Sequence, residues 1–187
     1  MQNLVFLGVT VWSLFSVKYF IATLKGEVRP NKVTWLLWSI APMIATFASL
    51  QGIGPSLSIL PVFISGFIPF LIFLASFINR KAYWRMGRFD LLCACISLIT
   101  LLIWGLSHNP ILATALSVFS DAMAAVPTVR KAWKYPETEN IYFFIGGIFS
   151  ALTSYFAIIE WNFTALAFPT YLVLLNILLV TVLKVRK

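Results

Sequence analysis

The sequence consists mainly of apolar runs of membrane-spanning length, separated by short polar turns. An α-helix of about 20 residues crosses the ~30 Å hydrocarbon layer of a bilayer, because each residue adds about 1.5 Å. Backbone N–H and C=O groups have no water to bond in hydrocarbon, so such runs fold as helices. With 60% hydrophobic and 11% charged residues, the chain leaves no stretch for a soluble domain. It predicts an all-α integral membrane protein with a single membrane domain, residues 1–187.

The polar turns divide the chain into seven expected membrane helices. The first lacks the basic start of a cleaved signal peptide, so we expect it to remain as a span. The fourth is expected to be the shortest. The approximate ranges are 3–24, 33–50, 56–78, 91–106, 110–130, 141–159 and 163–183.

Basic residues mark alternate turns. Of the fourteen Lys and Arg residues, all but Lys18 lie in the turns after the first, third and fifth helices or in the C-terminal tail. Basic turns stay on the cytoplasmic side of a membrane, so we expect a multi-pass protein of the cytoplasmic membrane with its N-terminus outside and its C-terminus inside. The net charge of +8 therefore reports orientation, and we expect no nucleic-acid partner.

The sequence also indicates an internal repeat. Residues 1–79 and 109–187 each hold three helices with a basic, proline-containing turn between the first two. Three crossings leave the chain on the wrong side to start the same unit again, and a linker helix within 90–107 corrects this. We therefore expect two parallel three-helix repeats joined by an inversion helix. A shift of 106 to 108 residues pairs Pro30 with Pro136, Phe47 with Tyr155, and Pro61 with Pro169.

One local motif accompanies this plan. Pro127 and Thr128 near the end of the fifth helix precede a basic turn at Arg130 and an acidic stretch that begins at Glu137. The motif and the three-plus-one-plus-three plan resemble the SWEET and PQ-loop transporter superfamily, whose repeats are parallel. The resemblance covers the whole chain in architecture and residues 120–140 in motif. It implies a carrier that works by alternating access.

Asp121 is the principal candidate for a functional side chain. It lies nine residues before Arg130, about 13 Å along a helix, so its short side chain does not reach the membrane surface. Inserting a charged residue near the middle of a membrane helix costs about 2.5 to 3.5 kcal/mol, so a carboxylate at this position indicates a functional or structural role. Lys18 lies at a matching depth in the first helix. If Lys18 and Asp121 pair and then separate during transport, Asp121 would take up a proton, because a carboxylate without its cation favours the neutral form in an apolar cavity. The alternative is that the two residues form a purely structural pair.

Other polar or helix-breaking residues within the expected spans complete the candidate site. We expect Pro127 and Pro42 to act as bending points for gating. The expected solute-lining residues carry hydroxyl, amide or indole groups, and helix-to-helix packing is the alternative role for each. They are Trp38, Ser39, Ser65, Ser150, Ser154, Thr170 and Asn176.

Nothing in the sequence indicates an enzyme. His108 is the sole histidine, so one chain cannot form a histidine-rich metal site or a Ser-His pair. Cys93 and Cys95 are two residues apart on a helix and point to different faces, which prevents a disulfide between them. We expect no metal and no cofactor.

The favoured function is a membrane carrier for a small polar or amphipathic solute such as a sugar, an amino acid or a vitamin-like metabolite. Its expected partners are the lipid bilayer and the solute, and the sequence is compatible with proton coupling and with a homo-oligomer. Two alternatives stay open. One is a PQ-loop-like membrane receptor, and the other is an assembly factor without a pathway.

The charge pattern generates a direct test of orientation in a variant without the native cysteines. Single cysteines at Gly54, His108 or Glu160 should react with an impermeant thiol reagent added to intact cells, and those at Lys32, Gly87 or Lys134 should react only after permeabilisation. The opposite pattern would reverse the orientation, and a mixed pattern would contradict the number of spans.

Overall fold

A computed structural model describes residues 2–53, 60–78, 86–106 and 109–186, which form seven α-helices and two short 3-10 helices. The expected seven α-helices are therefore confirmed. In chain order the elements are α1 (Gln2–Lys25), α2 (Lys32–Ile53), α3 (Leu60–Ile78), α4 (Arg88–Leu106), α5 (Pro110–Lys134), η3 (Pro136–Thr138), α6 (Ile141–Ser154), η4 (Tyr155–Ala157) and α7 (Phe163–Arg186).

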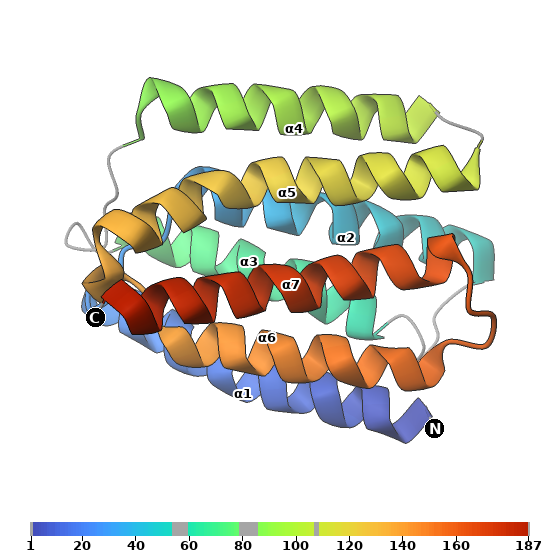
Figure 1. The fold of residues 1–187 in the computed structure, drawn as a ribbon, viewed down its shortest axis with the longest axis horizontal. Helices are drawn as coiled ribbons and strands as arrows, with labels where there is room; N and C mark the ends of the chain where they lie inside the picture. Colours follow the sequence, from blue (N-terminus) through green and yellow to red (C-terminus); the bar gives the residue numbers. More distant parts are fainter. Residues whose placement is uncertain (1, 54–59, 79–85, 107–108, 187) are drawn as a thin grey trace.

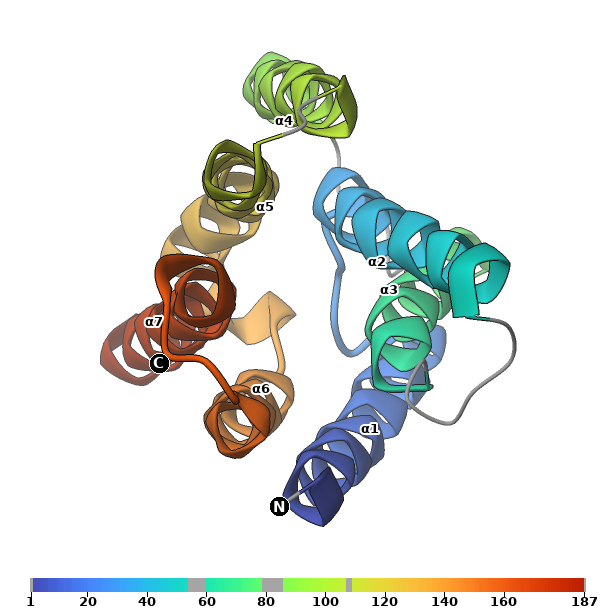
Figure 2. The ribbon, with the colours of Figure 1, turned by 90° about the vertical axis from the view of Figure 1, so that its right-hand side faces the viewer.

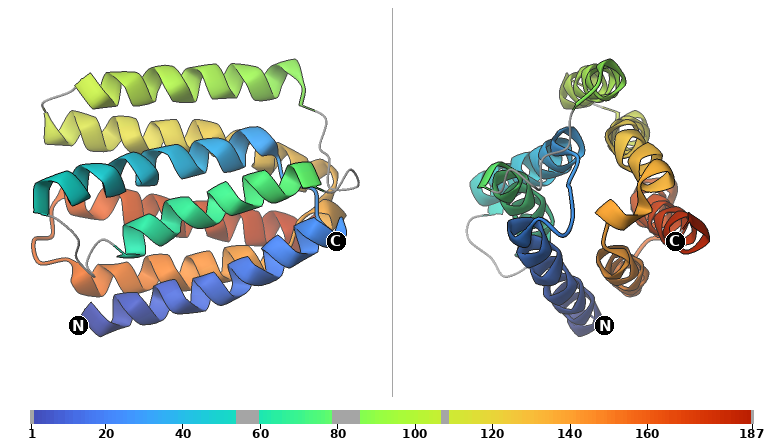
Figure 3. Two further views of the ribbon diagram at one scale, coloured as in Figure 1. Left: turned by 180° about the vertical axis from the view of Figure 1, so that it is seen from behind. Right: turned by 90° about the vertical axis from the view of Figure 1, so that its left-hand side faces the viewer.

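The helices form two layers that run side by side (Figure 1). In the first layer α3 packs against both α1 and α2, and in the second α7 packs against both α5 and α6. Across the layers, α1 packs along α6 and α2 packs against α5. Figure 2 shows the two layers end-on, with α4 outside them against α5 and α2. Figure 3 shows the first layer from the opposite side.

The two ends of the bundle differ in charge. Helices α1, α5 and α7 all finish at the end that holds the C-terminus, and each carries basic residues in its last turn (Figure 1). We call this the basic end; the N-terminus lies at the opposite end. Within the part of the chain that the structure describes, five helices are long and apolar enough to cross a membrane, namely α1, α3, α4, α5 and α7, and the apolar parts of α2 and α6 are shorter.

Several expected boundaries are wrong, and so is the expectation that the fourth helix is the shortest. Helix α5 continues to Lys134, beyond the expected end near Arg130. Helix α6 has 14 residues and is shorter than α4, which has 19. Helix α6 ends at Ser154 because the chain tightens into the 3-10 turn η4 before the next loop. Helix α4 begins at Arg88 rather than at Leu91, since the Asp90 carboxylate accepts a hydrogen bond from the backbone N–H of Gly87 and stabilises the first turn. The expected start of the third helix, residue 56, falls outside the described residues.

An aromatic cluster holds the two layers together toward the basic end. The Tyr19 ring of α1 lies 4.9 Å from the Trp35 ring of α2 and 5.3 Å from the Phe143 ring of α6, measured between centroids. Trp35 and Phe143 are 5.0 Å apart in an edge-on arrangement. Tilted and edge-on aromatic pairs contribute about 0.5 to 1.5 kcal/mol each beyond the area they bury. The cluster therefore stabilises the contact between layers as well as each layer.

Small residues let α1 and α6 approach closely. A Cβ atom added to Gly8 would lie 1.9 Å from Thr153 Oγ1 and 3.1 Å from the backbone Cα of Ser150. One added to Gly146 would lie 2.8 Å from a ring atom of Phe15. Small residues are the usual means of close helix contact in membranes, where dispersion replaces the hydrophobic effect as the main attraction.

This contact predicts that Gly8→Ala destabilises the protein although alanine favours helix formation. The added methyl group would push α6 away from α1, and overpacking of this kind costs about 1 to 3 kcal/mol. Gly105→Ala is the matched control, because nothing lies within 4 Å of its added Cβ and alanine gains about 0.5 to 1 kcal/mol in a helix. Thermal unfolding in detergent should show a lower Tm for Gly8→Ala only. Equal Tm values for the two variants would contradict the close contact.

Candidate functional site

A carboxylate from the second layer and an indole from the first lie together inside the bundle. The Tyr171 hydroxyl of α7 donates a 2.6 Å hydrogen bond to Oδ2 of Asp121 on α5, and this bond is partly buried. Trp38 of α2 packs against the buried cluster that contains Ala124, one turn from Asp121. Its indole Nε1 is close enough to the carboxylate to interact with it, but it makes no hydrogen bond of normal geometry and is buried. We call Asp121, Tyr171 and Trp38 the central site.

The local sequence explains why α5 and α2 can approach each other here. Ala124 and Ala125 follow Asp121 and are buried, and their small side chains leave room for the neighbouring helix. Thr34 of α2 donates a 2.7 Å hydrogen bond from its Oγ1 to the backbone carbonyl of Ala124. This bond fixes α2 against α5 one turn from the central site.

The central site can hold a polar group from a solute. A carboxylate has about four acceptor positions, and Tyr171 occupies one of them. No ion pair to Asp121 occurs among the described residues, so its carboxylate is available to an ammonium or hydroxyl group. The indole N–H of Trp38 offers a donor to an acceptor on the same solute. A buried donor without a partner costs about 1 to 3 kcal/mol, which a bound acceptor would remove.

The expected partnership between Lys18 and Asp121 is not formed. The Lys18 side chain is exposed, and its Nζ lies 5.7 Å from the centre of the Phe15 ring on the same helix. The adjacent residue Tyr19 is the one that faces the core, fully buried. A helix turns by about 100° per residue, so the face that buries Tyr19 directs Lys18 elsewhere. The proton switch built on this pair has no geometric basis here.

Most of the expected solute-lining hydroxyls are satisfied locally. Hydroxyl side chains in apolar helices commonly donate to the carbonyl three or four residues earlier, which uses their single donor and leaves only acceptor positions for a solute. Ser39, Ser65 and Ser154 do so, to Leu36, Val62 and Ala151. Thr170 bonds with Tyr155 instead.

The remaining two candidates take part in helix packing. The Asn176 amide donates to the backbone carbonyl of Leu172, and its Oδ1 lies where a side chain on Gly147 of α6 would begin. Ser150 lies with its backbone against Gly8. Of the predicted lining residues, Trp38 interacts with Asp121, and Tyr171, which was not predicted, donates a hydrogen bond to it.

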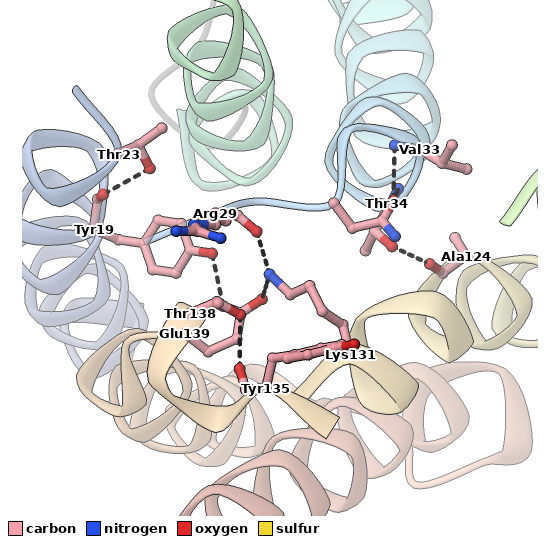
Figure 4. A network of polar contacts seen from close by, with 11 residues as sticks. Tyr19, Thr23, Arg29, Val33, Thr34, Ala124, Lys131, Tyr135, Thr138 and Glu139 are labelled. Carbon is pink, nitrogen blue, oxygen red and sulfur yellow. Dashed lines mark hydrogen bonds and ion pairs between the residues drawn. The ribbon is translucent and has the colours of Figure 1, made fainter. Parts of the chain in front are cut away.

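A second polar cluster closes the basic end of the bundle. Lys131 Nζ of α5 lies 2.5 Å from Oε1 of Glu139, and both side chains are fully buried. The Tyr19 hydroxyl of α1 donates a 2.7 Å hydrogen bond to Oε2 of the same carboxylate. Lys131 Nζ also donates to the backbone carbonyl of Arg29, as Figure 4 shows. We call Tyr19, Arg29, Lys131 and Glu139 the closing network.

The backbone extends this closure. The Arg29 N–H donates a 2.9 Å hydrogen bond to the carbonyl of Thr138 in η3. The turn between α1 and α2 is thereby bonded to the turn between α5 and α6. Asn31 then starts α2, since its Oδ1 accepts from the N–H groups of Val33 and Thr34. The closing network therefore joins the two layers where their proline-containing turns meet.

Sequence reasoning did not assign the closing network. Lys131 was expected to report orientation, Glu139 to belong to a polar stretch, and Tyr19 had no assigned role. The chain has only six acidic residues, so a glutamate directly after a basic turn was the available signal. Pro127, an expected gating residue, is buried within α5, between Asp121 of the central site and Lys131. Pro42 lies in α2 against Gly66 of α3.

The described residues contain no group of three His, Cys, Asp or Glu side chains that could hold a metal ion. A scan of protein-family models gives no match, and neither curated proteins nor solved structures give a significant match. The basis for assigning a function is therefore the arrangement of the central site and the closing network.

The closing network predicts an asymmetric effect of single and double substitutions. Glu139→Gln leaves Lys131 as a buried charge without its counterion, and breaking a buried pair in this way costs about 3 to 5 kcal/mol. The double variant Lys131→Met/Glu139→Gln removes both charges and should recover much of the lost stability. Thermal unfolding in detergent measures both.

Glu137→Gln is the matched control, because Glu137 is two residues away and exposed. Its Tm should stay close to that of the wild type. If the double variant is no more stable than Glu139→Gln alone, the loss of stability does not come from an unpaired charge on Lys131, and the prediction is wrong.

Proposed function

We propose that this protein is a membrane carrier that moves a small polar solute by alternating access, with its basic end in the cytoplasm. The observation that carries the proposal is the central site, where Asp121 of one layer and the unpartnered indole of Trp38 of the other lie together. A site shared by two layers changes its exposure when the layers move against each other. The distribution of basic residues supports the orientation.

The helix arrangement supports two parallel repeats. In each layer the third helix of the set packs against the other two, so the spatial orders α1-α3-α2 and α5-α7-α6 are the same. If α1, α2 and α3 correspond to α5, α6 and α7, the contact of α1 with α6 has the contact of α5 with α2 as its counterpart. Both contacts occur. Helix α4 lies outside both layers, as expected of a linker (Figure 2). These features also support membership of the SWEET and PQ-loop superfamily.

In this mechanism the closing network is the cytoplasmic gate. Opening the gate separates the Tyr19 hydroxyl from Glu139 and the Lys131 ammonium from the Arg29 carbonyl, because these bonds cross between the layers. Lys131 and Glu139 belong to the same layer and remain paired, so no bare charge is left in the membrane. Pro127 removes one backbone hydrogen bond from α5 and gives its cytoplasmic end a place to bend.

The chemistry of the central site restricts the solute. Asp121 accepts hydrogen bonds and carries a charge that no described lysine or arginine neutralises, so the solute should bear an ammonium or several hydroxyl groups. Trp38 adds a donor and an aromatic face, which suits a cation or the apolar face of a sugar ring. Amino acids, amines and sugars are therefore the classes to test first.

The central site predicts that Asp121→Asn weakens solute binding and uptake by roughly tenfold or more. A hydrogen bond to a charged group contributes about 1.5 to 3 kcal/mol, and 1.4 kcal/mol corresponds to tenfold. Asparagine still accepts from Tyr171, so the fold should persist. Proteoliposomes loaded with labelled amino acids, amines and sugars measure transport, and a thermal-shift screen with the same solutes measures binding.

Glu160→Gln is the control for a lost carboxylate, since Glu160 is exposed at the end of the bundle opposite the basic end. It should transport like the wild type. Binding without uptake would favour the receptor alternative. If no tested class of solute is bound or transported, the carrier proposal is wrong.

A further inference from the structure

A basic cavity opens beside the closing network, at the basic end of the bundle. Its volume is about 530 Å³, within the usual range for ligand sites. It lies between the start of α4, the end of α5 and the turns that hold Arg29 and η3. Its lining comprises Arg29, Gly87, Phe89, Asp90, Pro127, Arg130, Lys131, Lys134, Tyr135, Glu137 and Thr138.

The charges in the lining favour an anion. Four side chains are cationic and two, Asp90 and Glu137, are anionic. The Lys131 charge is matched by Glu139, and Asp90 accepts the N–H of Gly87. Arg29, Arg130 and Lys134 therefore outnumber the two carboxylates in the lining, and they come from two different segments of the chain.

The position of Arg130 is fixed by an aromatic ring. Its guanidinium carbon lies 4.5 Å from the centre of the Phe89 ring on α4, a cation–π geometry that limits the freedom of a long side chain. Arginine held in place presents paired N–H donors that match two oxygens of a phosphate. Lys134, four residues later on α5, adds a point charge on the same side of the helix.

The cavity also lies at the depth of lipid headgroups if the helices cross a bilayer. Phe89, Trp133 and Tyr135 surround this end of the bundle and are 37%, 51% and 47% exposed. Aromatic residues at helix ends are typical of the membrane interface. Basic pockets between helices on the cytoplasmic side are suited to anionic headgroups.

We propose that this cavity is a binding site for a phosphate-bearing anion, either the headgroup of an anionic phospholipid or a free phosphate compound. It is separate from the central site, so its occupancy does not depend on the identity of the transported solute. Because Lys131 lines the cavity and also holds Glu139, a bound anion would lie directly beside the closing network.

The test compares two variants that lose the same charge. Arg130→Gln/Lys134→Gln removes two cations from the cavity, and Lys25→Gln/Lys184→Gln removes two exposed cations of the basic end that do not line it. Native mass spectrometry of the detergent-purified protein measures binding of dioleoyl phosphatidylglycerol, with dioleoyl phosphatidylcholine as the neutral lipid. The cavity variant should lose about tenfold or more in affinity for phosphatidylglycerol, and the control should lose little.

A third variant should change affinity in the other direction. Glu137→Gln removes a carboxylate from the lining and should tighten binding of the same lipid. Inorganic phosphate added alone separates the two sources: if it raises the Tm of the wild type but not of the cavity variant, the site takes free phosphate, and if only the lipid binds, it is a headgroup site. Equal losses in the two double variants, or unchanged affinity in Glu137→Gln, would overturn the proposal.

Discussion

The closing network depends on the fully buried ion pair between Lys131 and Glu139. Two charges can be withdrawn from water only if their remaining hydrogen-bonding positions are also used. Here the Tyr19 hydroxyl and the Arg29 carbonyl each fill one of those positions, and both come from the other layer. The pair therefore determines where the turn between α1 and α2 must lie. Through the backbone bond from Arg29 to Thr138, it also determines how the two proline-containing turns meet.

Two acidic side chains inside the bundle have contrasting surroundings. Glu139 has a cation and a tyrosine hydroxyl as partners, whereas Asp121 has a tyrosine hydroxyl and a nearby indole. A carboxylate that is already neutralised stabilises the contact between layers. One that is not neutralised is costly to keep in an apolar helix and suits the binding of a ligand. The difference supports assigning closure to Glu139 and solute binding to Asp121.

Hydropathy alone was sufficient to predict seven helices, because apolar runs such as 91–106 admit only one structure in a membrane. Asp121 and Trp38 were also identified from sequence, since each is a polar group within an apolar run. The rotation of each helix was not predictable. Helix α1 carries apolar residues around most of its circumference, so no stripe indicates whether Lys18 or Tyr19 faces inward. The same uncertainty affected the serines, whose hydroxyls bond to their own helices. The closing network was also not predictable, because it joins residues 102 and 120 positions apart in the chain.

The short separation between Lys131 and Glu139 has a consequence for how the chain enters the membrane. Both residues belong to one hairpin, formed by the end of α5, η3 and the start of α6, so they can find each other before the first layer is in place. A lysine and a glutamate that enter the bilayer interface as a pair carry no net charge there. This hairpin can therefore enter the interface with the charges of Lys131 and Glu139 already matched. At the closing network, contact between the two layers then adds hydrogen bonds from Tyr19 and to the Arg29 carbonyl, and no new charge is buried at that place.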